Sequence, residues 1–169
     1  MQQIIIPKLS DLRLELVPLT KNDANRYHEL YTTLDALEVY NEKAILDRES
    51  PSEFTARILS YCVGIWTIRL TEEPDKIIGD CALHHWMQVK GEIEIGGTLF
   101  PDFWGRNMMQ EAFSLLFTFA QQTLNVHTII GITQANNSRA TRMVLKLGFK
   151  ITSRNENEII LKKKLSYTV

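Results

Sequence analysis

Apolar and polar residues alternate with a period of two in several short segments of this chain. Successive side chains of a β-strand point to opposite faces, so this alternation predicts strands with one buried face. The clearest example is residues 92–99, where glutamate and isoleucine alternate before two glycines. Further strands are predicted at residues 12–16, ending at Pro18, and at residues 63–70, 76–86, 126–133, 149–153 and 158–163, with a polar turn at 71–75.

Apolar residues at three- and four-residue spacing predict helices between these strands. The longest is residues 108–122, in which Met108, Ala112, Leu115, Leu116 and Phe119 share one face. Three more are predicted: residues 20–34 with Thr20 as the cap, residues 51–60 with Ser50 as the cap, and a helix from Asn136 or Asn137 that Gly148 stops. Residues 35–49 show no clear period.

The segment 99–112 joins the strand 92–99 to the longest helix, and it contains the only Trp-Gly pair of the chain, Trp104-Gly105. A helix that starts just after a glycine turn presents unpaired backbone N–H groups and the positive end of its dipole. Both favour a phosphate-bearing ligand. Most strand-turn-helix junctions bind nothing, however, and the turn alone also explains Gly105.

Size and charge narrow the classes of function. A chain of 169 residues with 44% apolar and 23% charged residues is typical of one globular domain, here residues 1–169. The formal net charge of −1 gives no polyanion-binding surface, so nucleic acid is not expected as a partner.

The two cysteines, Cys62 and Cys81, have no partners at metal-ligand spacing, so neither a disulfide framework nor a metal site is predicted. Pro7 stops the apolar run Ile4-Ile5-Ile6, which is too short for a signal sequence. No apolar run approaches the ~20 residues that span a bilayer. We therefore expect a cytoplasmic protein with reduced thiols and no membrane partner.

Three segments together resemble the GNAT acyltransferases. Residues 101–107, PDFWGRN, are similar to the P-x-x-W-G-(K/R)-G turn of that family. Residues 137–149, NSRATRMVLKLGF, are similar to its N-x-x-(A/S)-x-x-hydrophobic-x-x-K-x-G-F helix end, and residues 12–24 are similar to its opening segment. The resemblance spans almost the whole chain, and it is greatest to the ribosomal-protein N-terminal alanine acetyltransferases and the spermidine acetyltransferases.

The resemblance implies an α/β (α+β) fold, with a mixed, mainly antiparallel sheet of six to seven strands flanked by about four helices. It also implies acetyl-CoA as the cofactor. The implied diphosphate-binding residues are Arg106, Asn107, Met108 and Met109, through backbone N–H groups, and those for the pantetheine arm are Leu99, with its neighbours Thr98 and Phe100, and Asn137.

Two of these positions have simpler explanations or depart from the family. Asn107 stands where the family has glycine, and asparagine is the least costly replacement if the backbone there is left-handed. Asn137 can cap a helix, bind the arm, or do both. For the strand end, Gly96-Gly97 could instead merely twist an ordinary strand.

The resemblance implies Glu94 as the base that takes a proton from an amine acceptor. The alternative is that Glu92 and Glu94 form a solvated face of the strand. His84 and His85 end the neighbouring predicted strand, and one of them must face roughly the same side as these glutamates. That histidine could relay the proton or be an ordinary residue at a strand end.

The proton donor for the departing thiolate is missing from its family positions. Ala140 and Val144 stand where family members carry serine and tyrosine. Water, Tyr31 or Tyr40 would have to serve instead.

The sequence thus predicts an N-acetyltransferase that moves an acetyl group from acetyl-CoA to a primary amine, either a protein N-terminus or a small molecule. An acidic pocket would favour a polyamine, although the acids of residues 35–49 are equally explained as solvated. The alternatives are a non-catalytic acyl-CoA-binding sensor or scaffold and, third, a structural domain without a ligand. A homodimer is left open.

Overall fold

The computed structural model describes residues 4–166, so the predicted domain, residues 1–169, extends beyond this range at both ends. An eight-stranded sheet forms its centre, in the order β1-β2-β3-β4-β5-β6-β8-β7. The strands are β1 (Leu9–Ser10), β2 (Leu14–Pro18), β3 (Cys62–Leu70), β4 (Glu73–Met87), β5 (Glu92–Leu99), β6 (Thr128–Gln134), β7 (Lys150–Arg154) and β8 (Glu158–Lys164). All neighbours are antiparallel except β5 and β6.

This sheet confirms the predicted fold class, and the strand count is one higher than predicted. The additional strand is β1, whose two residues are too short to show a period. The four predicted helices are present as α1 (Ala24–Ala36), α2 (Pro51–Tyr61), α3 (Met108–Leu124) and α4 (Ser138–Lys146). Short 3-10 turns lie at Lys21–Asp23, Gln88–Lys90 and Pro101–Phe103.

Two of the boundaries predicted for the strands are wrong, the start of the strand at residue 12 and the extent of the turn at 71–75. Leu12 is fully exposed and precedes β2, because the Asp11 carboxylate accepts the N–H groups of Arg13 and Leu14 and turns the chain there. The predicted turn at 71–75 is shorter, because β4 already begins at Glu73 and pairs with β3 through an irregular register.

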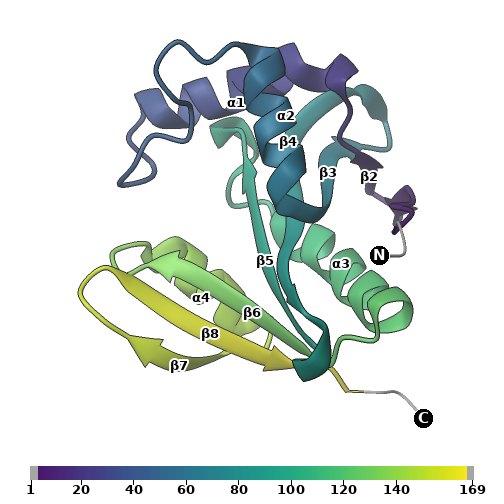
Figure 1. The fold of residues 1–169 in the computed structure, drawn as a ribbon, viewed down its shortest axis with the longest axis vertical. Coiled ribbons are helices and arrows are strands. Elements are labelled where there is room, and N and C mark those ends of the chain that lie inside the picture. Colours follow the sequence, from purple (N-terminus) through teal and green to yellow (C-terminus); the bar gives the residue numbers. More distant parts are fainter. Residues whose placement is uncertain (1–3, 167–169) are drawn as a thin grey trace.

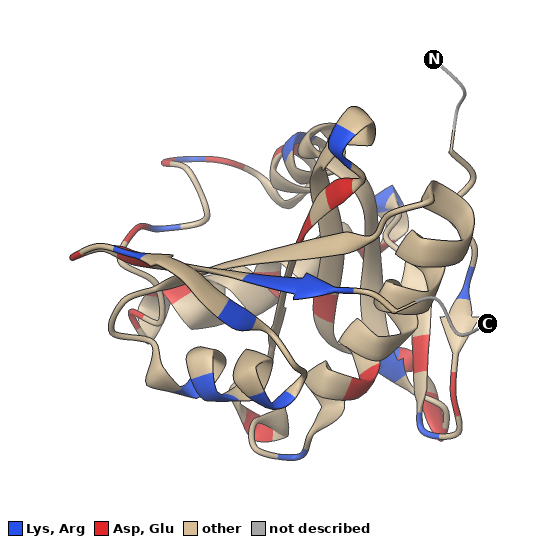
Figure 2. Ribbon diagram, turned by 90° about the horizontal axis from the view of Figure 1, so that it is seen from below, with Lys and Arg blue, Asp and Glu red and all other residues tan. Residues whose placement is uncertain are grey.

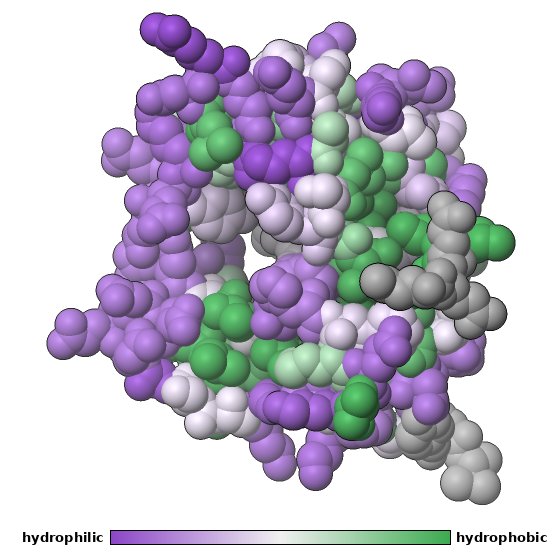
Figure 3. Space-filling view, in the orientation of Figure 1, coloured by the Kyte–Doolittle hydropathy of each residue, from purple (hydrophilic) through white to green (hydrophobic). Residues whose placement is uncertain are grey.

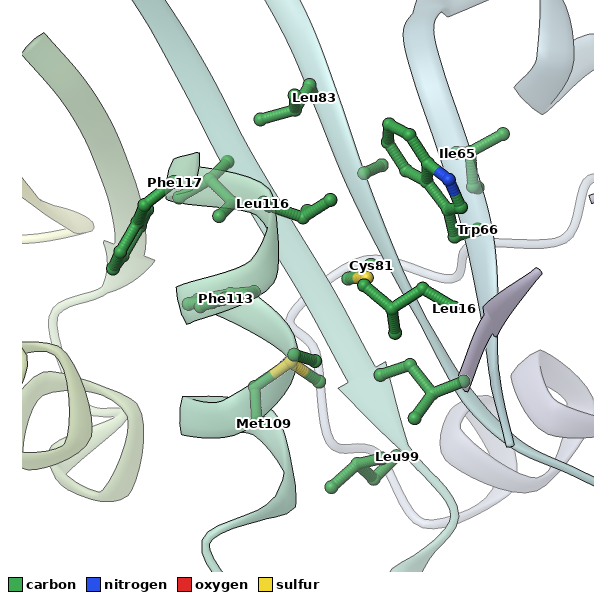
Figure 4. Close-up of a cluster of buried hydrophobic side chains, with 14 of the residues drawn as sticks. Leu16, Ile65, Trp66, Cys81, Leu83, Leu99, Met109, Phe113, Leu116 and Phe117 are labelled. Carbon is green, nitrogen blue, oxygen red and sulfur yellow. The ribbon is translucent and has the colours of Figure 1, made fainter. Parts of the chain in front are cut away.

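Helices α1 and α2 cover one face of the sheet and α3 covers the other, as Figure 1 shows. The α3 face is apolar: Trp66, Cys81, Leu83, Met109 and Leu116 pack there between the strands and the helix (Figure 4). Because side chains alternate along a strand, the residues between these point to the α1 face. On β5 the alternation places the packed residues on the α3 face and Glu94, Gly96 and Thr98 on the α1 face.

The parallel pairing of β5 with β6 is short. It joins Glu92–Ile95 to residues 128–131, and beyond Ile95 the two strands part, as the V between β5 and β6 in Figure 1 shows. The sheet consequently consists of two halves that meet at one end of β5, and the chain between α1 and α2 arches over the opening.

Asp80 anchors α1 to the sheet on the α1 face. Its side chain is only 2% exposed, and Oδ2 accepts hydrogen bonds from the hydroxyls of Tyr27 (2.9 Å) and Tyr31 (2.7 Å). Oδ1 accepts the Thr98 N–H of β5 at 3.1 Å. Burial raises the pKa of Asp80 from 3.8 to about 6, although these three hydrogen bonds oppose the change.

This pKa predicts a specific pH dependence of stability. Between the unfolded and folded pKa values, folded Asp80 holds a proton that the unfolded chain has lost, so the free energy of unfolding falls as pH rises. From about pH 4 to about pH 7, we expect wild type to lose up to about 3 kcal/mol relative to Asp80→Asn, measured by urea denaturation. Asp102→Asn, an exposed aspartate, is the control, and a wild-type-to-Asp80→Asn difference that stays constant with pH would contradict the prediction.

Candidate functional site

A cleft of about 570 Å³ lies where β5 and β6 part. Its walls come from the end of β5, the start of α4 and the chain that follows α1. Figure 3 shows this face hollowed between the α1–α2 half and the half built on β6, β8 and β7. Of the residues predicted from sequence to bind a cofactor, Leu99, Met109 and Asn137 line this cleft.

A second hollow, of about 350 Å³, lies at the N-terminus of α3 and shares Leu99, Trp104 and Met109 with the cleft. Arg106, Asn107 and Met108 line it too, so every predicted cofactor-binding residue except Phe100 lines one or both of the two cavities. The first N–H groups of α3 have no acceptor within the helix. The position therefore offers donors to an anion.

The turn before α3 is bent in two places. Gly105 has φ 74° and Asn107 has φ 61°, both in the left-handed region. Asn107 thus has the conformation in which asparagine is the least costly non-glycine residue. Arg13 braces the turn, since its guanidinium donates to the Arg106 carbonyl at 2.7 Å and binds Glu111 of α3.

A row of cations on α4 faces the same hollow. Arg139, Arg142 and Lys146 line it, and α4 carries no acidic residue (Figure 2). The Arg139 guanidinium lies over the Trp104 ring at 4.6 Å. Sequence reasoning missed this row, although its spacing of three and four residues puts all three side chains on one helix face.

The backbone of β5 beyond Ile95 faces the cleft only at alternate residues. The Phe100 N–H donates to the Ile78 carbonyl of β4 at 2.9 Å, and the Thr98 N–H donates to Asp80. The backbone N–H and C=O groups of Leu99 and Gly97 therefore point to the opposite side, where β6 no longer pairs with β5. Of the predicted trio 98–100, only Leu99 points that way. Its carbonyl accepts the Trp104 Nε1–H at 3.0 Å.

Asn137 caps α4, since its Oδ1 accepts the Ala140 N–H at 3.1 Å. This confirms the helix-cap interpretation of the residue. Because an amide group has separate donor and acceptor atoms, the Nδ2 donors are not used by this bond. Capping and ligand binding are therefore compatible in this residue.

Glu94 lies on the α1 face of β5 with two histidines of β4. Its Oε2 is 3.3 Å from His84 Nε2 and 2.8 Å from His85 Nδ1. Sequence reasoning expected one histidine on this side, and both are there. Burial lowers the pKa of His84, an effect that the Glu94 carboxylate opposes. Gly96 follows on the same face, and a Cβ there would lie 3.3 Å from the His84 ring.

Glu92 does not join this group. Its carboxylate binds Lys162 Nζ of β8 at 2.9 Å. The two glutamates are therefore not an equivalent solvated pair, because their partners differ.

Tyr40 lies beside the two positions that lack a hydroxyl. It lines a cavity of about 190 Å³ between the parted strands, together with Gly97, Ala140 and Val144. Burial raises the pKa of Tyr40, so the phenol stays protonated at neutral pH. Tyr31 differs, because its hydroxyl donates to Asp80.

The five acids of residues 35–49, at the end of α1 and in the loop that follows it, have mixed roles. Asp35 accepts the N–H groups of Ala44 and Ile45, and Glu49 binds Arg57. Glu38 lines the cleft. Asp35 and Glu49 thus support the loop itself and are not available to bind a polycationic acceptor.

Comparison with known proteins identifies the family. Residues 13–150 match the family model described as an acetyltransferase (GNAT) domain. The chain belongs to the GNAT acetyltransferases. A curated relative of this GNAT protein, "Uncharacterized N-acetyltransferase p20" of Bacillus licheniformis, is 27% identical over 81 residues. That match covers 48% of the chain, and the chain spans about half (46%) of the relative's length.

Solved structures share the GNAT fold at low sequence identity. The ribosomal-protein-S5-alanine acetyltransferase of Vibrio fischeri has a TM-score of 0.79 at 14% identity, over 94% of this chain and 97% of that one. The ribosomal L7/L12 α-N-protein acetyltransferase RimL, in complex with coenzyme A, has a TM-score of 0.75 at 15% identity, over 94% and 98%. Among the described residues of this GNAT chain, no helix has both the length and the apolar character to cross a membrane.

Proposed function

We propose that this protein is an N-acetyltransferase that moves an acetyl group from acetyl-CoA to a primary amine. One observation carries the proposal. The unpaired edge of β5 leads directly to the N-terminus of α3, beside a row of three cations. An elongated ligand with a hydrogen-bonding arm and an anionic end matches that order of groups. RimL, a structural neighbour, binds coenzyme A.

In this proposal the diphosphate lies at the N–H groups of Arg106, Asn107, Met108 and Met109. Arg139, Arg142 and Lys146 add positive charge from α4. The pantetheine arm pairs with the backbone of β5 at Leu99 and, beyond the residues predicted from sequence, at Gly97. Asn137 contributes its amide Nδ2 donors. Backbone donors suit this role because they lose no side-chain entropy on binding.

Glu94 is the proposed general base. The amine nitrogen attacks the thioester carbonyl carbon, and its proton passes to the Glu94 carboxylate directly or through a water. The C–S bond breaks, and Tyr40 protonates the departing thiolate in place of the hydroxyls missing at Ala140 and Val144. Gly96 lies between Glu94 and Thr98 on the same face of β5, and a Cβ there would lie 3.3 Å from the His84 ring, so glycine keeps this face clear beside the proposed base.

The acceptor class remains a protein N-terminus or a small primary amine. The ribosomal-protein acetyltransferases among the structural neighbours support the former. Asp35 of α1 and Glu49 hold the loop after α1 together, so these acids give little support to a polyamine acceptor. We further propose a cytoplasmic location, where the thiols of Cys62 and Cys81, both free in the structure, stay reduced.

The proposed cofactor site predicts that acetyl-CoA and free CoA raise the melting temperature, whereas an equal concentration of ATP does so less. A ligand at a hundredfold excess over its Kd stabilises the folded state by about 2.7 kcal/mol. Arg142→Glu should weaken CoA binding about tenfold, because it replaces an attraction to phosphate by a repulsion. Lys90→Glu, an exposed charge reversal outside both cavities, is the control. Equal affinities of the two variants would count against the α4 row.

The proposed base predicts that Glu94→Gln lowers kcat for acetyl transfer by about 10²-fold or more while CoA affinity is retained. Glu92→Gln is a matched control, since it makes the same change on the same strand face but at the glutamate bound to Lys162. Thiol release from acetyl-CoA in the presence of an amine is the measurement. Binding of CoA without any thiol release by wild type would instead favour the sensor or scaffold alternative.

The proposed proton donor predicts that Tyr40→Phe lowers kcat by about 10²-fold, because the thiolate must then leave without a positioned acid. Tyr61→Phe, at an exposed tyrosine, removes a hydroxyl elsewhere and should leave kcat unchanged. The rate should recover in Tyr40→Phe when the thioester carries a better leaving group. A full rate with acetyl-CoA in Tyr40→Phe would exclude this role.

A further inference from the structure

His84, His85 and Glu94 form a cluster that the transfer reaction does not fully use. One ligand atom from each lies within 4.8 Å of the other two. Glu94 Oε2 is near both rings, and the ring centroids are 5.3 Å apart in an edge-to-face arrangement. Two imidazoles and one carboxylate close to one another are a typical set of ligands for a divalent cation such as zinc.

The backbone is distorted where this cluster forms. Consecutive residues of a regular strand point to opposite faces, so His84 and His85 would normally be separated by the sheet. Here the β4–β5 register shifts between His84 and Met87, and His85 has φ 47°. A left-handed histidine is unfavourable by about 1 kcal/mol. The irregularity turns the second ring back to the first and to Glu94.

Exposure and charge also suit a bound cation. The Glu94 and His84 side chains are 18% and 29% exposed, whereas that of His85 is 73% exposed. The cluster is thus half-buried on the β5 side and open on the other, which leaves a coordination position for water. Glu92, the next residue on this face of β5, is held by Lys162. Among the described residues, no lysine or arginine forms an ion pair with Glu94.

We propose that His84, His85 and Glu94 bind a divalent transition metal of the zinc class, through His84 Nε2, His85 Nδ1 and a Glu94 carboxylate oxygen. This site departs from the expectation, based on the sequence, that the chain holds no metal. Occupation engages the Glu94 carboxylate, so the metal inhibits acetyl transfer. That last step rests on the proposed role of Glu94, whereas the metal site does not.

The direct test uses Co²⁺ and Zn²⁺ with the full-length protein. Co²⁺ should produce the visible bands of a nitrogen- and oxygen-ligated site, without the thiolate charge transfer that Cys62 or Cys81 would give. Zn²⁺ should displace it at one equivalent. His85→Asn keeps a residue that tolerates the left-handed backbone and should weaken Zn²⁺ binding at least about tenfold in calorimetry. Absence of binding to wild type would overturn the proposal.

His127→Asn is the matched control, because His127 is an exposed histidine outside the cluster. It should bind Zn²⁺ as wild type does. Glu94→Gln provides a second variant, and it should lose affinity as His85→Asn does. If His85→Asn and Glu94→Gln both retain wild-type affinity, the metal lies elsewhere and the assignment is wrong.

A final measurement separates the metal site from the proposed function. Zn²⁺ should inhibit acetyl transfer by wild type, and His85→Asn should resist the same concentration relative to its own metal-free rate. Metal binding with the expected variant pattern in a protein without transferase activity would refute the function and keep the site. Transferase activity in a protein that binds no Zn²⁺ would refute the metal site and leave the proposed function standing. Full activity with the cluster occupied would refute inhibition through Glu94.

Discussion

The early end of the parallel pairing between β5 and β6 is the constraint on which the candidate site depends. After Ile95, β5 has β4 on one side and no strand on the other. Its backbone groups at Gly97 and Leu99 therefore face a cleft. Asp80 helps to hold this geometry, because its carboxylate binds the Thr98 N–H and two tyrosines of α1 at the same point. A buried carboxylate is costly unless it accepts hydrogen bonds, and here it accepts three.

The period of two along β5 separates the two tasks of the strand. Gly97 lies on the α3 face, and a Cβ on it would lie 2.8 Å from the Asp80 carbonyl oxygen and 2.9 Å from the Met109 sulfur, so close packing requires glycine there. Glu94, Gly96 and Thr98 point to the other face, which α1 and its following loop only partly cover. The strand can thus be part of a rigid core and carry chemistry at once. For this reason, the residues of the candidate site alternate along β5 with residues that pack against α3.

Most elements of the fold could be predicted from the sequence, because they follow from local patterns. The strand 92–99, the start of α3 at Met108 and the cap of α2 at Ser50 are as predicted. The cofactor-binding residues came from resemblance, and all of them except Phe100 line two adjoining cavities in the structure. The cationic row of α4 was missed, and Tyr40 was named only beside water and Tyr31 as a possible proton donor, for another reason. Their common position depends on how α4 and the loop after α1 sit across the parted strands, which no local pattern records.

The histidine pair shows how a single irregularity limits what periodicity can predict. Strict alternation places only one of two consecutive residues beside Glu94, whereas the shifted register and the left-handed His85 place both there. An unfavourable backbone conformation persists only where its surroundings fix it, and such positions cluster at functional sites. Under the two proposals made above, the carboxylate of Glu94 has two competing partners, an amine proton and a metal ion. Both need the same oxygen lone pairs, so the strand position that suits a base also suits an inhibitor.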